Sequence, residues 1–152
     1  NTSFPSILIL HLDKMFPKKT KKAPTVAKLK KKLWKLFSEY IRRLYSHNWI
    51  CECVTCGVKK PWKEMQAGHY IPAWSSNYLR FVEMNVHPQC YVCNCMKHSN
   101  PIEYRIYMEQ RYSAKMIDML IQQRNEVKRF TVWELMQKID EYEWKLAILD
   151  RE

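Results

Sequence analysis

The chain has 152 residues, 47% of them hydrophobic, a length and composition that suit one compact domain with a buried core and an extension. Only two glycines occur, Gly57 and Gly68, which argues against a glycine-rich phosphate loop or a dinucleotide-binding fold. The formal net charge is +11 at pH 7, so a negatively charged partner is expected.

Residues 1–25 are expected to be an extension of the fold. Residues 4–12 are apolar, but the run is short and follows no basic stretch, so neither a membrane span nor a secretory signal is predicted. Residues 14–32 alternate lysine clusters with two prolines, which predicts a flexible basic arm. Nearly all of the net charge lies in residues 1–50. A basic arm on a nearly neutral body is typical of nucleic-acid-binding proteins, and a solvated helix that only aids solubility is the alternative.

Residues 26–49 are predicted to form a basic amphipathic helix. Apolar side chains recur there at spacings of three and four, with lysines between them. This apolar stripe comprises Val26, Leu29, Leu33, Phe37, Tyr40 and Leu44. Four lysines of the segment, Lys28, Lys30, Lys31 and Lys32, are candidate contacts to DNA phosphates.

Residues 50–105 contain all six cysteines and are predicted to be the functional core. Two pairs, Cys53-x-x-Cys56 and Cys90-x-x-Cys93, have the spacing of a tetrahedral structural zinc site with four thiolates. Cys51 and Cys95 flank these pairs and are not needed as ligands. Disulfides are the alternative in a secreted protein, but no secretion signal is predicted, so we expect one structural Zn²⁺ per chain.

The remaining elements alternate short strands with helices. Strands are predicted at 65–70 and 78–82, followed by a helix that starts near 90–94. Residues 106–152 are assigned to C-terminal helices; one helix is predicted over 102–112 and another from Ser113.

The last helix has the clearest start, because Thr131-x-x-Glu134 is a capping box. Its apolar stripe comprises Val132, Leu135, Ile139, Tyr142, Leu146 and Leu149. This stripe can form a dimer seam, or it can pack against the first helix of the same chain.

A set of polar residues lies between the cysteine pairs and just after the second pair. In chain order these are Gly68-His69, Asn85, His87 and Asn94. Their order resembles the HNH nuclease pattern, in which a histidine ends the first strand, an asparagine braces the connecting loop and a residue on the helix binds a metal. The resemblance implies an α+β fold with a small zinc-stapled ββα-metal (HNH-like) centre flanked by N- and C-terminal helices.

The same segment resembles more closely the phage NinG (Rap) family of recombination nucleases. The matching residues are Cys53-x-x-Cys56-Gly57, Ala67-Gly68-His69-Tyr70, Leu79-Arg80-Phe81, Asn85-x-His87-x-Gln89-Cys90-x-Val92-Cys93-Asn94, Lys97, Asn100 and Tyr104-Arg105. Each piece alone is common, but all of them in this order and spacing are specific. The match is dense over 53–105, whereas the flanking helices agree in type more than in residues.

The resemblance implies a role for each residue of the polar set. His69 would be the general base, because histidine titrates near neutral pH, and Asn94 and His87 would bind a catalytic Mg²⁺ or Mn²⁺. Asn85 would brace the loop beside the base. Many relatives in the wider class place a metal ligand just before the base, whereas Gly68 cannot bind a metal.

Each of these residues also has a purely structural interpretation. His69 can be a half-buried histidine with satisfied hydrogen bonds, and His87 can be a neighbour of the zinc site. Asn85 and Asn94 can be turn and cap residues.

The predicted function is a Mg²⁺-dependent endonuclease that hydrolyses phosphodiesters in branched or recombining DNA, such as Holliday junctions or flaps. Arg80 and Lys97 would contact phosphates, although an isolated basic residue is often only solvated. Two symmetric cuts favour a homodimer. No membrane and no small-molecule cofactor are expected, and the protein would act in the cytoplasm of the phage host.

Three other functions stay open from the sequence. They are an HNH nuclease without structure preference, a non-catalytic zinc DNA-binding module and an RNA-binding zinc protein of the ribosomal kind. The intact His69 and Asn94 favour cleavage, because a module that only binds has no need of that histidine.

Overall fold

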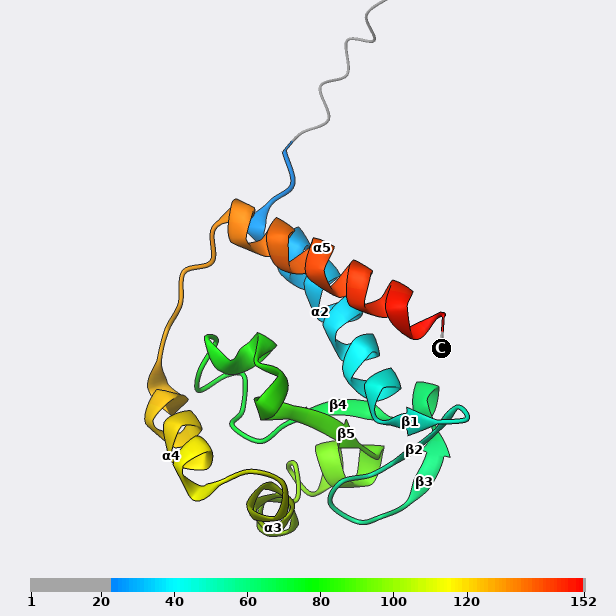
Figure 1. Ribbon diagram of the computed structural model, residues 1–152. Coiled ribbons are helices and arrows are strands. Elements are labelled where there is room, and N and C mark those ends of the chain that lie inside the picture. The colour runs from blue at the N-terminus through cyan, green and yellow to red at the C-terminus, as the bar shows by residue number, and fades with distance from the viewer. Residues whose placement is uncertain (1–22, 152) are drawn as a thin grey trace, which may run out of the picture.

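The computed structural model describes residues 23–151, so most of the expected extension and the first part of the basic arm lie outside the described residues. Two long helices, α2 (Val26–Leu44) and α5 (Val132–Leu149), lie side by side (Figure 1). The strands and two shorter helices, α3 (Pro101–Arg111) and α4 (Ala114–Gln122), form the rest of the molecule. The architecture is mixed α and β, as the sequence predicts.

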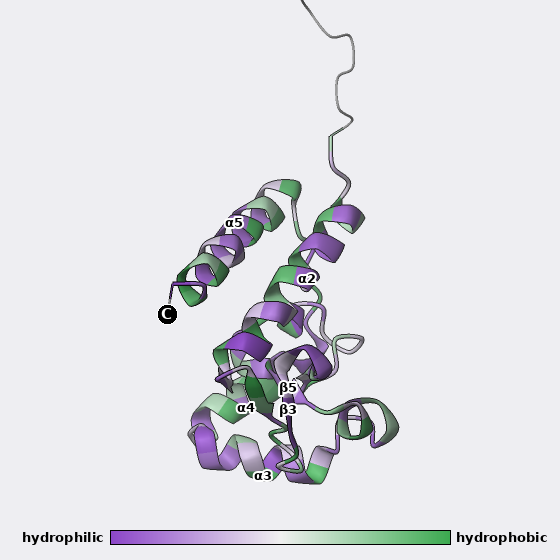
Figure 2. Cartoon of the chain, turned by 90° about the vertical axis from the view of Figure 1, so that its right-hand side faces the viewer, coloured by the Kyte–Doolittle hydropathy of each residue, from purple (hydrophilic) through white to green (hydrophobic). Residues whose placement is uncertain are grey.

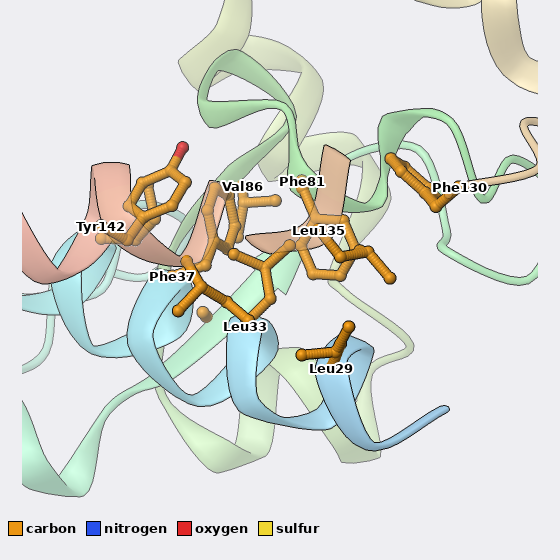
Figure 3. Packing of buried hydrophobic residues seen from close by; sticks show 11 residues of the cluster. Leu29, Leu33, Phe37, Phe81, Val86, Phe130, Leu135 and Tyr142 are labelled. Atoms are coloured by element: carbon orange, nitrogen blue, oxygen red, sulfur yellow. The ribbon is translucent and has the colours of Figure 1, made fainter. Parts of the chain in front are cut away.

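The helices α2 and α5 pack through the apolar stripes predicted for them. Their buried side chains are Leu29, Leu33, Phe37 and Ile41 of α2 and Leu135, Ile139, Tyr142 and Leu146 of α5. The ring of Phe37 meets Tyr142 edge to face with centroids 5.1 Å apart, and both lie in one cluster with Phe81 and Val86 (Figure 3). Leu44 differs from the prediction, because it is exposed where α2 ends, and Ile41 is buried instead.

Helix α5 begins at the predicted capping box. Oγ1 of Thr131 accepts a hydrogen bond from the Glu134 N–H (3.2 Å), and Oε2 of Glu134 accepts one from the Thr131 N–H (2.8 Å).

Hydrophobic and hydrophilic residues alternate along both long helices (Figure 2). Because the buried residues of α5 pack with those of α2, the same-chain alternative for this stripe is confirmed, and a dimer would need another surface.

A three-stranded antiparallel sheet follows α2, made of β1 (Ser46–His47), β2 (Ile50–Glu52) and β3 (Lys59–Pro61) in that order. The prediction of a helix as far as residue 49 is therefore wrong beyond Leu44. Asn48 and Trp49 have φ angles of 47° and 67°, the left-handed region that a tight turn between β1 and β2 requires and a helix excludes.

The candidate site lies on a second sheet, the antiparallel pair β4 (Gln66–His69) and β5 (Val86–Gln89). Gly68 pairs with His87, and His69 pairs with Val86. The strand predicted at 65–70 is confirmed as β4.

The strand predicted at 78–82 is wrong, because this segment forms a short 3-10 turn, Leu79–Phe81, and a second turn, Glu83–Asn85, follows it. Its alternating apolar residues serve two different cores: Leu79 packs with Tyr104, whereas Phe81 packs with Phe37. The true partner of β4 contains Pro88, which donates no strand hydrogen bond, and a proline in the sequence argues against a strand.

The helix predicted to start near 90–94 is only one π-helical turn, Val92–Met96. Helices α3 and α4 match the predicted positions, and Oγ of Ser113 caps α4 by accepting from the Met116 N–H. A separate apolar cluster holds α3 and α4 against the site segment, with Leu79, Tyr104, Met108, Ile117 and Leu120 at its centre. None of the helices in residues 23–151 combines the length and apolar character needed to cross a membrane.

Candidate functional site

Four cysteines converge where the loop after β2 meets the end of β5. The Sγ atoms of Cys53, Cys56, Cys90 and Cys93 all lie within 4.8 Å of one another. All six cysteines of the chain are free thiols, so the structure does not support the disulfide alternative. A set of four thiolates at this spacing fits one tetrahedral zinc ion, and the predicted cysteines are the ones that come together.

The backbone around this cluster is shaped to bring the thiols together. Gly57 has a φ of +74°, which lets its N–H donate to the Cys53 carbonyl (2.9 Å) and close the first loop. After the second pair, residues 98–100 all have left-handed φ angles. Nδ2 of Asn100 lies 3.9 Å from Cys93 Sγ and donates to it, so this unusual loop is tied to the cysteine cluster.

His69 ends β4 and is held on two sides. Its ring stacks on Trp34 of α2, with centroids 5.1 Å apart and planes 16° apart. Its Nε2 lies 3.1 Å from the carbonyl oxygen of Arg80. Because a carbonyl only accepts, Nε2 carries the proton and Nδ1 keeps its lone pair.

Burial lowers the pKa of His69, and the nearby Arg80 charge adds to this, while the hydrogen bond to the Arg80 carbonyl acts in the opposite direction. The imidazole is therefore neutral at pH 7. A neutral ring with one nitrogen fixed and the other unprotonated is the form that a general base needs.

Asn85 is fully buried and closes the long loop between the strands. Its Oδ1 accepts from the Ile71 N–H (2.7 Å), and its Nδ2 donates to the carbonyls of Ile71 (2.9 Å) and Leu79 (3.2 Å). These three bonds hold the chain on which Arg80 presents its carbonyl to His69. Asn85 therefore positions the candidate base and, being fully buried, is out of reach of a substrate.

Asn94 lies in the π-helical turn beside Gly68. Its Nδ2 donates to Oε1 of Gln66 (2.6 Å), which fixes the amide, and its Oδ1 would lie 2.9 Å from a Cβ built on Gly68. Neighbouring residues of a strand point to opposite faces, so His69 faces α2 whereas Asn94 approaches the Gly68 face of β4.

His87 is not brought to Asn94 as a ligand, which corrects the expectation from the sequence. It is fully buried, and its ring nitrogens are both hydrogen-bonded, Nδ1 to the Tyr104 hydroxyl (2.9 Å) and Nε2 to the Tyr112 hydroxyl (2.8 Å). The Tyr104 hydroxyl donates to the Gly68 carbonyl (2.9 Å), so His87 must donate from Nδ1 and accept at Nε2. Burial first, and the Arg111 charge second, lower its pKa to about 3. His87 is a neutral link in a buried chain of hydrogen bonds.

The basic residues differ in how much of their charge is available to a partner. The guanidinium of Arg80 lies 5.7 Å from the centre of the Trp34 ring, close to His69, and its buried Nε has no hydrogen-bond partner among residues 23–151. Lys97 is exposed just after the π-helical turn, as are Lys28 and Lys31 on α2.

The other two predicted lysines of α2 are engaged within the chain. Nζ of Lys32 pairs with Glu143 at 2.7 Å, and Nζ of Lys30 lies 5.4 Å from the centre of the Phe130 ring. Both contacts leave less of the positive charge of these two lysines available to the phosphates of a nucleic acid.

Several residues of the site are not evident from the sequence. Trp34 and the hydroxyls of Tyr104 and Tyr112 come from other elements, and only the tertiary fold brings them here. Gln66 lies on β4 itself, but only the fold shows that it holds the Asn94 amide. Gln89 is one of the residues that match the NinG family, and its place between His87 and Cys90 is the one signal that could have singled it out.

Comparisons with known proteins point to one family of phage proteins. The family model described as Bacteriophage Lambda NinG protein matches residues 13–152. Protein ninG of Escherichia phage lambda is 34% identical over 97 residues, which are 64% of this chain and 47% of that protein, and the same figures hold for Protein ninG of Salmonella phage P22. Protein ninG of Enterobacteria phage H19B is 33% identical over 82 residues, 54% of this chain and 40% of that protein.

The chain thus spans about half the length of the curated relatives it matches, and no solved structure matches it. The family model nevertheless covers almost all of the chain, including the cysteine cluster, His69 and Asn94. This chain belongs to the NinG family of bacteriophage lambda.

Proposed function

We propose that this chain is a zinc-stabilised, HNH-type endonuclease that hydrolyses phosphodiesters in branched or recombining DNA with the help of a divalent cation. The observation that carries the proposal is the state of His69. Its Nε2 is held by a backbone carbonyl, its ring is stacked on Trp34, and its pKa is lowered. A basic nitrogen is therefore available one residue along β4 from Gly68, which the Asn94 amide approaches.

His69 would take a proton from the water that attacks the phosphorus. Nδ1 is the atom that accepts this proton, because Nε2 is already a donor to Arg80. The positive charge that then forms on the ring is stabilised by the Arg80 carbonyl dipole and by the face of Trp34.

The residues on the Gly68 face fit a hard divalent cation such as Mg²⁺ or Mn²⁺. The amide oxygen of Asn94 is a ligand type that these ions use, and Gln66 fixes its direction. When bound, such a cation would neutralise the charge that develops on the phosphate and leaving oxygens.

The four cysteines would hold zinc as a structural staple. They join the loop after β2 to the residues that follow β5, and so set the position of the π-helical turn that carries Asn94. Four thiolates leave no open position on the ion, so zinc would not take part in cleavage.

DNA would be held by basic side chains around this centre. Arg80 is next to His69, and a guanidinium at this place suits a phosphate contact beside the base. Lys97 and the exposed lysines of α2 would extend the contact along the backbone.

The test is cleavage by the zinc-loaded chain of a four-way junction, a matched duplex and single strands, with and without Mg²⁺. We expect Mg²⁺-dependent cutting of the junction, and a rate that falls about 10²-fold or more for His69→Ala, the usual range for a general base. The matched control is His47→Ala, because His47 is exposed on β1.

Each rival function has its own outcome in this assay. Equal cutting of junction and duplex would indicate a nuclease without structure preference. Binding of DNA without any cutting would indicate a non-catalytic zinc DNA-binding module. Preferential binding of an added RNA hairpin would indicate an RNA-binding zinc protein of the ribosomal kind. Wild-type rates for His69→Ala would refute the assignment of the base.

A further inference from the structure

The face of β4 next to His69 is covered by the side chain of Gln89. A Cβ built on Gly68 would lie 2.0 Å from Oε1 of Gln89 and 2.9 Å from Oδ1 of Asn94. Position 68 must therefore be a glycine, since the place of its side chain is taken by two amide oxygens from other parts of the chain.

The orientation of the Gln89 amide is fixed by its nitrogen. Nε2 donates to Oγ1 of Thr55 (3.2 Å) and to the carbonyl of Ser99 (2.8 Å). Because the Ser99 carbonyl can only accept, the amide cannot be reversed. Its oxygen is left pointing at Gly68.

The oxygen of Gln89 is a buried acceptor that lacks a hydrogen-bond partner among residues 23–151, and the whole side chain is inaccessible to solvent. Buried polar atoms without partners are rare, because leaving water without replacement is costly, and a site for an ion is one of the recognised explanations. The second oxygen on this face, Oδ1 of Asn94, is likewise directed to Gly68 because Nδ2 is held by Gln66.

We propose that Oε1 of Gln89 and Oδ1 of Asn94 bind the divalent cation together, with Gln89 in the place that a side chain at position 68 would occupy. This inference rests on the proposed function, and it supplies the second protein ligand that His87 cannot provide. Both ligands are neutral amides, so the cation keeps its full charge and needs the DNA phosphate to complete a tight site.

Gln89 also connects this site to the cysteine cluster. The hydroxyl of Thr55, which accepts from Gln89 Nε2, lies 3.3 Å from Sγ of Cys53. A thiolate that holds zinc accepts from this hydroxyl, so zinc binding would fix Thr55 and, through it, the direction of the Gln89 oxygen.

The test measures the cation directly rather than the reaction. Mn²⁺ is titrated into the zinc-loaded chain with a non-cleaved DNA present, and free Mn²⁺ is measured by electron paramagnetic resonance. Gln89→Met and Asn94→Ala should each weaken Mn²⁺ binding about tenfold or more, as changes in and around a metal site do. Gln110→Met, an exposed position on α3, is the matched control and should bind as the wild type does. Zinc content and circular dichroism show that each variant is folded.

A second measurement avoids the variants altogether. Crystals of the wild-type chain soaked in Mn²⁺ should give an anomalous peak at ligand distance from both amide oxygens. The inference would be overturned if the Mn²⁺ peak lay at ligand distance from Asn94 but not from Gln89. It would also be overturned if folded Gln89→Met bound Mn²⁺ as tightly as the wild type. Either result would show that Gln89 only supports the structure.

These outcomes are separate from those of the nuclease proposal. If both amides bind Mn²⁺ but the chain cuts no DNA, the cation site is supported and the nuclease proposal is refuted. If the wild type cuts DNA but Gln89→Met binds Mn²⁺ normally, the nuclease proposal is supported and the cation site is refuted.

Discussion

Removing one hydroxyl, in Tyr104→Phe, should destabilise the fold well beyond the usual cost of a single atom. Tyr104 is fully buried, and its hydroxyl donates to the Gly68 carbonyl while accepting from His87 Nδ1. Phenylalanine fills the same space but leaves the buried Nδ1–H of His87 unpaired and removes one hydrogen bond from the Gly68 carbonyl. At ~1–3 kcal/mol for the unpaired imidazole N–H and ~0.5–1.5 kcal/mol for the bond lost at the carbonyl, the free energy of unfolding should fall by about 1.5–4.5 kcal/mol.

Urea unfolding of the zinc-loaded chain measures this decrease, with two variants for comparison. Tyr112→Phe removes the partly buried bond to His87 Nε2, so it should cost about 1–2 kcal/mol. Tyr91→Phe is the control, because Tyr91 is 59% exposed, and it should change stability by less than about 0.5 kcal/mol. If Tyr104→Phe costs no more than Tyr91→Phe, the chain of hydrogen bonds through His87 does not hold the strand.

Metal analysis of the reduced, purified chain should find one zinc ion per protein, and Cys90→Ser should lose it; protein without zinc would refute the four-thiolate site. The free energy of unfolding should fall as the pH drops below about 6.5, because His87, with a folded pKa of about 3, stays neutral while the unfolded chain takes up a proton. His87→Gln should show a shallower dependence between about pH 7 and 5.5, and an unchanged slope would exclude His87 as its source. Replacing Lys28 and Lys31 by alanine should lower the log–log salt slope of DNA binding by roughly 0.9 for each phosphate that these lysines neutralise, whereas an equal slope would leave them as solvated residues. Light scattering with junction DNA should give the mass of one junction plus two chains, since two symmetric cuts need two sites, and a mass of one junction plus one chain would leave a nicking or flap-type enzyme.

The elements that could be predicted from the sequence are those whose signals are local. The capping box at Thr131 and the apolar period of α2 place the starts of α5 and α2 nearly to the residue, since both signals depend on side chains within a few positions of each other. The predicted end of α2 at residue 49 is too late, because the helix ends at Leu44. The cysteine pairs are equally local, because the first loop closes within four residues. The resemblance to the NinG family, which the family model confirms, joins these pieces into one segment.

The wrong predictions fall where distant contacts decide the structure. The segment 78–82 alternates like a strand, but Asn85 bonds to the Leu79 carbonyl and closes it into turns. The role of His87 is not evident from its neighbours in sequence, because the two tyrosines that occupy its nitrogens come from α3 and the residue after it. The role of Gln89 depends on the absence of a side chain at Gly68, and only the fold shows that these two residues meet.

The strand β4 is held from two faces by different parts of the chain, and this separates the two halves of the proposed site. On one face, Trp34 and the Arg80 carbonyl fix His69, and both depend on α2 and the loop that Asn85 closes. On the other face, Gln89 is fixed through Thr55 next to the cysteine cluster. Removal of zinc should therefore disturb the proposed amide ligands before it disturbs the proposed base, whereas a change at Trp34 should alter the pKa of His69 and leave the amides in place. Because the two halves of the proposed site are carried by the neighbouring residues Gly68 and His69, the peptide between them would have to stay rigid for both halves to reach one phosphate. The bond from Tyr104 to the Gly68 carbonyl supplies that rigidity.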